Sequence, residues 1–271
     1  PVGSEFEQTD NYKTYQRSGL PVSLDDLKAY YSCDETTGDV INRASTIGST
    51  DAISSFDLSP IADSGTVTQG VTGLIDKAIS FTGNASAQAD DSNLTDTAFI
   101  SNTGAIWTIC LWVKMDNRVG DQAWIATTDF GVGQNGIYFR MQSASGTVYC
   151  KFGTQGDVKG GTTSTQVIPD ATDWHFIVAQ YDYQVGTTNI SVDNGTLEAV
   201  ATGETLDTTT TPQAKLHLGN VPQLDNDLNG DIDEVSIWNR ILTTAELTKI
   251  YNAGSGKLLG SGSWVERGTA I

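Results

Sequence analysis

Residues 230–251 read GDIDEVSIWNRILTTAELTKIY, and this stretch indicates how the chain closes its fold. Val235 and Ile237 alternate with polar residues, which is typical of a strand buried on one face. Asp231 and Asp233 flank an apolar residue at the start of that strand and give it an acidic entrance. The stretch therefore predicts a half-buried strand whose first residues include two carboxylates.

A short helix is expected after this strand. Thr243 is followed three residues later by Glu246, which is the spacing of a capping box. Gly254 stands where a C-cap glycine belongs. The apolar face of the helix would consist of Leu247, Ile250 and Tyr251.

The rest of the chain predicts many short strands joined by Gly, Asn, Asp and Thr turns. Residues 106–115, IWTICLWVKM, are apolar at nearly every position and should form a central strand covered on both faces. Asn194-Gly195 favours a type I′ hairpin, and residues 42–73 suggest a long loop with at most short strands. Further strands are expected at 27–34, 78–83, 124–128, 136–142, 147–152, 174–183, 189–192, 197–201 and 215–218. This pattern favours an all-β, antiparallel β-sandwich with jelly-roll topology and one short C-terminal helix.

The boundaries of this domain follow from composition. Residues 3–6, GSEF, are what two adjacent cloning sites would encode, so residues 1–6 are interpreted as a cloning scar. Residues 7–27 are polar and predict an N-terminal extension, and residues 28–254 predict the sandwich. Residues 255–271 are either a tail that folds back or a linker to a further domain.

Charge narrows the classes of partner. The chain of 271 residues has 33 acidic and 15 basic residues, a formal net charge of −18. Such a surface repels phosphate backbones, so nucleic acid is not expected as a partner. No apolar run approaches the roughly 20 residues of a membrane span, so membrane insertion is not expected. Cys33, Cys110 and Cys150 are too few and too far apart for a disulfide framework or a zinc site, and buried free thiols are favoured over one bridge.

Five segments, taken in order, resemble the laminin-G-like group of the concanavalin A-like lectin and glucanase superfamily. The resemblance spans roughly residues 28–254 and implies the sandwich fold. The closing segment is similar to the family's Gly-x-Ile-Asp-Glu-Val-x-Ile-Trp-Asn-Arg signature. The segments are LKAYYSCDETTGDVINRAS, GLIDKAISFTGNAS, IWTICLWVKMD, DWHFIVAQYD with ISVDNGTLEA, and LNGDIDEVSIWNRILTTAEL.

The resemblance also implies a structural Ca²⁺ site. Asp233 would supply its carboxylate, with backbone carbonyls from near Cys33 and Asp34 and from Gly83 or Asn84. Ca²⁺ prefers several oxygen ligands in flexible geometry, and glycine turns expose carbonyls. The alternative is that Asp233 instead accepts backbone N–H groups at a strand end.

Catalysis is not expected from these residues. The glucanases of the superfamily carry a strand with two glutamates around an aspartate, and no such strand is present. Polysaccharide lyases of related fold would need Arg, His and Tyr on facing strands of a concave face. His175, Tyr138, Arg140 and Tyr149 could be assembled into that picture, although His175 falls on a structural position of the family.

Sugar recognition needs aromatic platforms beside hydrogen-bonding groups, because sugar rings have apolar C–H faces and polar rims. Trp124 and Tyr183 border loops, and Tyr138 and Tyr149 lie outside the most apolar strand, so these four are the candidate ligand-binding residues. Core packing is the alternative for each of them.

The sequence thus predicts a non-catalytic carbohydrate-binding or adhesion domain of a larger secreted or surface-displayed protein, with structural calcium. Its partners would be a glycan or polysaccharide, together with other domains or subunits of its assembly. One alternative is a structural or protein-contact module, such as part of a surface layer or a virion fibre. The other is a polysaccharide hydrolase or lyase.

Overall fold

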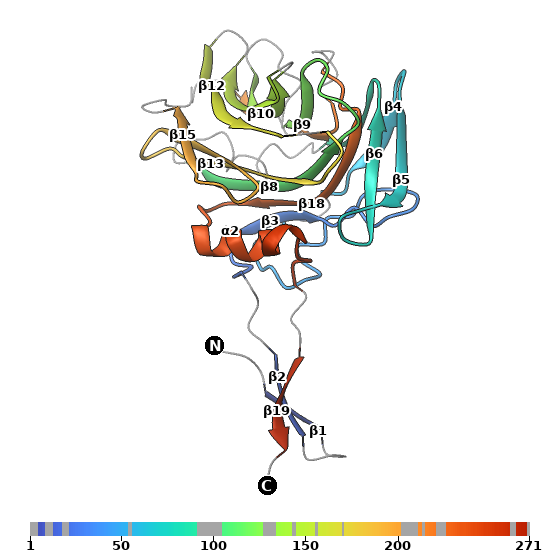
Figure 1. Ribbon diagram of the computed structural model, residues 1–271, viewed down its shortest axis with the longest axis vertical. Coiled ribbons are helices and arrows are strands. Elements are labelled where there is room, and N and C mark those ends of the chain that lie inside the picture. The colour runs from blue at the N-terminus through green and yellow to red at the C-terminus, as the bar shows by residue number, and fades with distance from the viewer. Residues whose placement is uncertain are drawn as a thin grey trace.

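The computed structural model describes most of the chain. The described residues are 5–8, 13–17, 22–53, 56–90, 105–126, 134–142, 145–154, 157–169, 171–201, 211–212, 215–220, 226–260 and 264–269. Within them the elements are almost entirely antiparallel strands with one α-helix (Figure 1). No helix among these residues is both long enough and apolar enough to cross a membrane.

Two stacked sheets form a β-sandwich, as the sequence predicts. The first, here named the β10 sheet, has the strand order β12-β11-β10-β9-β17-β7-β4, with β16 (Thr211–Pro212) beside β10. Its strands are β4 (Ser59–Ala62), β7 (Ala85–Asp90), β9 (Gln122–Ala126), β10 (Gln134–Gln142), β11 (Thr147–Thr154), β12 (Asp157–Val167) and β17 (Lys215–Leu218).

The second sheet, here named the β8 sheet, has the order β15-β14-β13-β8-β18-β6-β5, with β3 also paired to β18. Its strands are β3 (Leu27–Tyr31), β5 (Thr66–Thr72), β6 (Lys77–Thr82), β8 (Ile106–Met115), β13 (His175–Asp182), β14 (Thr187–Val192), β15 (Glu198–Ala201) and β18 (Gly230–Trp238). Strand β8 has the predicted bounds and lies between β13 and β18 in the middle of this sheet.

Strand β8 is apolar on both faces because it borders two cores. Ile109, Leu111 and Val113 belong to the core between the sheets. Cys110 and Trp112 point the other way, into a second core on the outer face of the β8 sheet. Side chains alternate along a strand, so a strand without polar alternation must be covered on both sides.

Helix α2 (Thr244–Tyr251) covers that outer face (Figure 1). The predicted capping box is present between Thr243 and Glu246, and Leu247 and Ile250 are buried. The helix ends at Asn252, whose φ of 49° is left-handed, and Gly254 instead ends the short 3₁₀ turn η1 (Asn252–Gly254). Asparagine tolerates the left-handed conformation, so the expected glycine C-cap is replaced by it.

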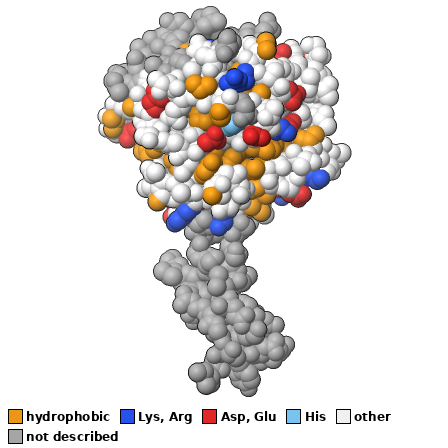
Figure 2. All heavy atoms as spheres, in the orientation of Figure 1, with side chains coloured by type: hydrophobic (Ala, Val, Ile, Leu, Met, Phe, Trp, Pro, Cys, Tyr) orange, Lys and Arg blue, Asp and Glu red, His pale blue; other side chains and the backbone are white. Residues whose placement is uncertain are grey.

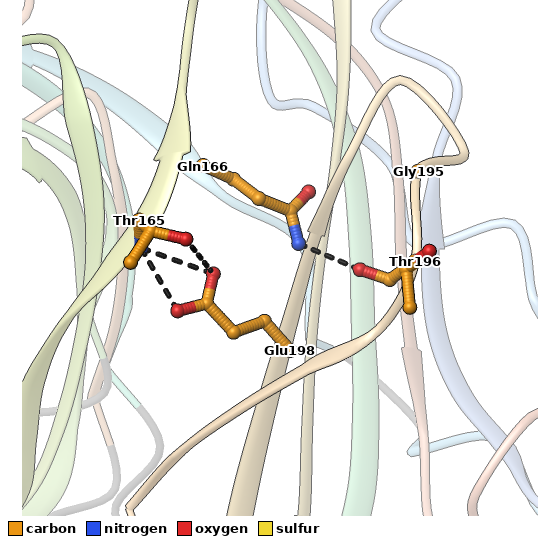
Figure 3. Close-up of a pocket in the computed structure, with 5 residues that line it drawn as sticks. All are labelled: Thr165, Gln166, Gly195, Thr196 and Glu198. Carbon is orange, nitrogen blue, oxygen red and sulfur yellow. Dashed lines mark hydrogen bonds between the residues drawn. The ribbon is translucent and has the colours of Figure 1, made fainter.

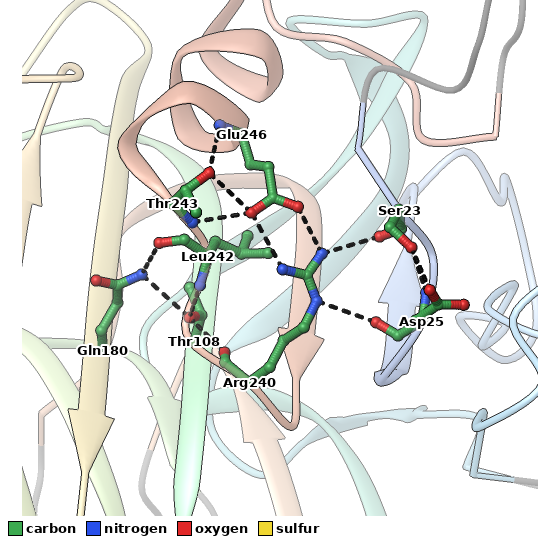
Figure 4. A network of polar contacts seen from close by, with 8 residues as sticks. All are labelled: Ser23, Asp25, Thr108, Gln180, Arg240, Leu242, Thr243 and Glu246. Atoms are coloured by element: carbon green, nitrogen blue, oxygen red, sulfur yellow. Dashed lines mark hydrogen bonds and ion pairs between the residues drawn. The ribbon is translucent and has the colours of Figure 1, made fainter.

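Polar contacts attach this helix to the sheet (Figure 4). The Arg240 guanidinium donates to both carboxylate oxygens of Glu246 and to the backbone carbonyls of Ser23 and Asp25. The Thr108 hydroxyl, on β8, donates to the Arg240 carbonyl at 2.7 Å and accepts from the Leu242 N–H at 3.0 Å. Helix α2 therefore covers the middle of the outer face of the β8 sheet, over β3, β8, β13 and β18.

The domain core extends beyond the predicted boundaries. Val22 and Leu24, expected in an extension, are buried in the second core, and so is Leu259 from the expected tail. Beyond them β1 (Glu5–Gln8), β2 (Lys13–Arg17) and β19 (Trp264–Thr269) form a separate three-stranded sheet, which Figure 1 shows below helix α2.

Several strands and one turn differ from expectation; among them, the seven-residue β5 lies in the segment expected to be a loop with at most short strands. Strand β7 and strand β12 were not expected, because β7 presents only alanines to the core and β12 is rich in Gly and Thr. In the β14–β15 connection the two residues with positive φ are Asp193 (51°) and Asn194 (58°), so the central pair of the turn is Asp-Asn and not Asn-Gly. The expectation of buried free thiols is confirmed for Cys33, Cys110 and Cys150.

Candidate functional site

The outer face of the β10 sheet carries a group of polar and aromatic side chains. Ile137, Phe139 and Met141 of β10 belong to the core between the sheets. The intervening Tyr138 and Arg140 therefore point outward, since successive side chains lie on opposite faces of a strand. Tyr149 of β11 pairs directly with Arg140 and lies on the same face.

A second row crosses the same face. His217 of β17 pairs with Gln88 of β7 on one side and with Ala126 of β9 on the other, and Ala126 pairs in turn with Tyr138. His217 and Tyr138 are thus two strands apart, roughly 10 Å. His217 is buried, with 1% of its surface exposed, so it supports this face and offers little surface to a ligand.

Arg140 is the centre of the group. Its guanidinium carbon lies 4.7 Å from the ring centroid of Tyr149 and 5.2 Å from that of Tyr138. Both distances are within the range of a cation–π contact. Asp121, from the loop before β9, forms an ion pair with the guanidinium, and 12% of the Arg140 side chain is exposed. We name Tyr138, Arg140, Tyr149 and Asp121 the Arg140 cluster.

Burial changes the ionisation of the cluster. It lowers the pKa of the Arg140 guanidinium, while the neighbouring Tyr149 raises that pKa to a smaller extent. It raises the pKa of the Tyr149 hydroxyl, against the opposing effect of Arg140. It likewise raises the pKa of Tyr138, against a hydrogen bond with the Asn226 side chain. At neutral pH both tyrosines are therefore neutral, and their hydroxyl groups can donate as well as accept hydrogen bonds.

Two of the four candidate aromatic residues lie elsewhere. Trp124 is 0% exposed and packs edge-on against Phe139 in the core, at a ring distance of 5.3 Å. An indole with no exposed surface cannot stack on a sugar. The prediction of Trp124 as a ligand-binding residue is therefore wrong, and Trp124 is a core residue. Tyr183 is half-buried against the same core, one residue beyond the end of β13.

His175, considered for a lyase site, belongs to the other sheet. It begins β13, and its Nδ1 lies 2.8 Å from the carboxylate of Asp193. The same carboxylate accepts the backbone N–H of Phe176. The structure thus brings together Tyr138, Arg140 and Tyr149 of that constellation and separates His175 from them.

Asp233, the expected calcium ligand, lies in a bulge of β18 where the pairing with β8 shifts register. It is 0% exposed, and its Oδ2 accepts the backbone N–H groups of Leu74 (2.9 Å) and Ile75 (3.0 Å). Its Oδ1 has no hydrogen-bond partner. Burial, and to a smaller extent Asp34, raise the pKa of Asp233 to about 7, against these hydrogen bonds.

The expected metal ligands fall into two groups. Asp34 lies near Asp233, as their electrostatic coupling shows, and its Oδ1 accepts the Lys77 N–H at the start of β6. Gly83 and Asn84 follow the other end of β6, where the Gly83 N–H donates to the Asn229 side chain. Since Gly230 pairs with Phe81 and Ile232 with Ile79, Gly83 lies on the far side of Gly230 from Asp233. The assignment of Gly83 and Asn84 as ligands beside Asp233 is therefore wrong, because these residues do not lie at the same site.

Metal-binding side chains are sparse in the part of the chain that the structure describes. No three His, Cys, Asp or Glu residues there lie so that they could together hold a metal ion. A cation at Asp233 would therefore need backbone carbonyls as well as carboxylates. Calcium accepts such mixed oxygen ligands.

A shallow pocket of about 510 Å³ opens where the edges of the two sheets meet (Figure 3). It is lined by Thr165, Gln166, Gly195, Thr196 and Glu198. The Gln166 amide donates to the carbonyls of Ile190 and Thr196 and accepts the Val192 N–H. The Glu198 carboxylate accepts the N–H and the hydroxyl of Thr165. These polar groups are occupied with one another, so the pocket joins the sheets and is less suited to a ligand than the Arg140 cluster.

The charges on one face of the molecule are of mixed sign. Figure 2 shows apolar side chains gathered in a band across one face, with basic and acidic groups scattered singly around it. Single charges of both signs do not form the continuous basic stripe of a nucleic-acid-binding protein. The charges on this face therefore do not indicate a nucleic-acid site.

Comparison with solved structures shows the fold. Domain 4 of the extracellular GH43 arabinanase AbnA from Geobacillus stearothermophilus, solved with arabinotriose, aligns with a TM-score of 0.60 and 17% identity over 86% of this chain and 98% of its own. The botulinum neurotoxin DC binding domain in complex with SialylT has a TM-score of 0.58 and 8% identity, covering 84% of this chain and 51% of its own. A Trypanosoma rangeli sialidase has a TM-score of 0.57 and 12% identity, covering 85% of this chain and 33% of its own.

Comparison of sequences gives the family. No curated protein sequence matches the chain. A family model described as the concanavalin A-like lectin/glucanases superfamily matches residues 81–248, which is more than half of the chain. The matched region runs from β6 through the Arg140 cluster to helix α2. The chain therefore belongs to the concanavalin A-like lectin/glucanases superfamily.

Proposed function

We propose that this domain binds carbohydrate without catalysing its cleavage, through the Arg140 cluster on the outer face of the β10 sheet. The observation that carries the proposal is the stacking of the Arg140 guanidinium on Tyr138 and Tyr149. Tyr138 is only 3% exposed and supports the guanidinium from within, so a sugar would contact the half-buried Tyr149 ring and the exposed edge of Arg140, which suit its apolar face and hydroxyl rim. The described strands β3, β8, β13 and β18 of the other sheet instead pack their outer face against helix α2.

Relatives with the same fold support a glycan ligand. The arabinanase domain was solved with arabinotriose, the toxin binding domain with SialylT, and the sialidase with a difluorosialic acid. The arabinanase is extracellular, and an extracellular or surface-displayed location is part of the proposal. The acidic composition, with a net charge of −18, suits such a location.

Asp231 and Asp233, the two carboxylates at the start of β18, do not favour a hydrolytic role. Asp233 is buried and held by two backbone N–H groups. Burial raises the pKa of Asp231, against a hydrogen bond from Ser80 and the charge of Lys114, and Asp231 pairs with Ser80 of β6 within the β8 sheet. Neither belongs to the Arg140 cluster, where the only carboxylate among the described residues is the one that pairs with Arg140.

The test is a binding screen on a panel of oligosaccharides with the intact chain and with Tyr149→Ala. Tyr149 is half-buried, so its loss should leave the fold intact while removing one ring from the platform. The proposal expects at least one oligosaccharide to bind with a micromolar-to-millimolar Kd and the variant to weaken it several-fold. A ligand whose affinity does not change in Tyr149→Ala would place the site elsewhere.

Calcium is a second part of the proposal, favoured by the buried Asp233 Oδ1 that has no hydrogen-bond partner. Asp233 and Asp34 would hold the ion together with nearby carbonyls, while Gly83 and Asn84 would not. The ion would offset the repulsion and burial that raise the pKa of Asp233. A chelator should then lower the melting temperature of the intact chain and leave that of Asp233→Asn unchanged. No shift in the intact chain would refute the calcium site.

A further inference from the structure

We propose that the glycan bound at the Arg140 cluster carries a carboxylate, as uronic and sialic acids do, and that Arg140 pairs with it. This inference rests on the proposed function and adds the class of ligand. Its basis is the state of Arg140 itself, which is a largely buried cation with donor capacity left over.

The orientation of the guanidinium is already fixed. Rings on two neighbouring strands, Tyr138 and Tyr149, lie 5.2 Å and 4.7 Å from its central carbon. Because Arg140 and Tyr149 are direct cross-strand partners, the sheet backbone sets their spacing. A pre-oriented guanidinium loses little conformational entropy when it forms a bidentate pair with a planar acid.

The guanidinium also has an unfilled donor. Its Nε is buried and has no hydrogen-bond partner, while Asp121 occupies the Nη1 position. A buried charged donor without an acceptor is costly. A ligand carboxylate that binds the exposed edge of the guanidinium, on the side away from Asp121, would give the cation a second anionic partner. A neutral hydroxyl would bind the same edge with a weaker, uncharged acceptor.

The overall charge of the chain does not oppose this ligand strongly. The excess of 33 acidic over 15 basic residues is spread over the molecule. At physiological salt, charges more than about 8 Å apart are largely screened. A contact pair in a site where 12% of the Arg140 side chain is exposed is screened much less. Local pairing therefore decides the preference, and the binding should weaken as salt is added.

The experiment compares matched sugars. Oligogalacturonides and sialyllactose are titrated against the intact chain, each beside the same compound after its carboxyl groups have been reduced to primary alcohols. The inference expects the acid of at least one pair to bind on the order of 10- to 100-fold more tightly than its reduced form. The two pairs distinguish a uronate from a sialate as the source of the carboxylate.

Variants assign the preference to Arg140. Arg140→Gln should abolish the preference for the acid, and Arg140→Lys, which keeps the charge but loses the planar fork, should reduce it. Asp121→Asn should increase the ratio of acid affinity to reduced-sugar affinity, a gain that misfolding cannot produce. Arg43→Gln is the control, because Arg43 pairs with Glu35 away from this sheet.

Three results would overturn the inference. Equal binding of acid and reduced sugars by the intact chain would leave the proposed function standing and remove the carboxylate. A preference that survives in Arg140→Gln, with the variant folded by its melting curve, would assign it to another residue. Absence of binding by both pairs would refute the inference, and only absence of binding by every oligosaccharide of the panel would refute the proposed function as well.

Discussion

Thr108→Val should destabilise the domain strongly although it changes almost no volume. The Thr108 side chain is 0% exposed, and its hydroxyl bonds to the Arg240 carbonyl, the Leu242 N–H and the Gln180 amide at 2.7, 3.0 and 3.2 Å. Valine keeps the shape and removes the hydroxyl. The carbonyl and the N–H are then left without their partner, and a buried polar group in that state costs about 1–3 kcal/mol.

The expected loss is about 3 kcal/mol, since the Gln180 amide keeps its second bond to the Leu242 carbonyl. Urea unfolding followed by tryptophan fluorescence measures it as a lower midpoint at an unchanged slope. For a domain of this size the melting temperature should fall by roughly 6–12 °C. Thr108→Ser is the matched control, because it keeps the hydroxyl and should lose about 1 kcal/mol.

Two outcomes would contradict this reasoning. A midpoint for Thr108→Val within error of the intact chain would show that the hydroxyl does not hold the segment before helix α2. An equal loss in Thr108→Ser would assign the effect to packing of the methyl group and not to the hydrogen bonds.

Two further variants test the helix attachment and the corrected position of an aromatic residue. Hydrogen bonds from Arg240 hold the pKa of Glu246 down at about 2. Because this folded value lies below the unfolded value of about 4.3, the stabilisation is complete above that pH and is lost as the pH falls towards 2. Glu246→Gln should therefore cost about 1–2 kcal/mol at pH 7 and almost nothing near pH 2 by urea unfolding, and a pH-independent difference would contradict the ion pair. Trp124→Ala should cost about 3–5 kcal/mol as a core truncation, whereas Trp124→Phe should leave glycan affinity unchanged, and a selective loss of affinity in Trp124→Phe would restore Trp124 as a ligand platform.

The sequence predicted the strands whose side chains are large. Strand β8 was located to the residue because seven of the ten residues from Ile106 to Met115 are apolar side chains that belong to the two cores. Strand β7 was missed although Ala85, Ala87 and Ala89 alternate into the core, since alanine gives little hydrophobic signal. Strand β12 was missed because Gly and Thr are as common in turns as in edge strands.

Part of the candidate site was predicted because two of its members, Tyr138 and Tyr149, have large aromatic side chains. Tyr138 and Tyr149 were identified as aromatic residues outside the most apolar strand, and strand alternation places them beside Arg140. Trp124 could not be assigned to a face, because the β9–β10 pairing shifts register between Phe139 and Arg140 and breaks simple alternation. His217 was recognisable by its position between Leu216 and Leu218, both in the core, which puts it on the outer face.

The metal residues show the limit of transferring a pattern. The signature containing Asp233 was located correctly on β18, and its carboxylate lies beside Asp34. The carbonyls assigned to Gly83 and Asn84 depend on strand register, which the sequence does not specify. The length of strand β6 therefore separates Gly83 and Asn84 from Asp233 and Asp34, although the sequence pattern placed all four together.

The central claim, a glycan site on the outer face of the β10 sheet, is tested most directly by mapping a bound oligosaccharide on the intact chain. Amide and side-chain NMR signals would be followed while the tightest ligand of the screen is added. We expect the largest shifts at Tyr138, Arg140 and Tyr149, with Leu247 and Ile250 of helix α2 unchanged. Shifts centred on helix α2 or on the pocket at Gln166 and Glu198, with the Arg140 cluster unchanged, would contradict the claim.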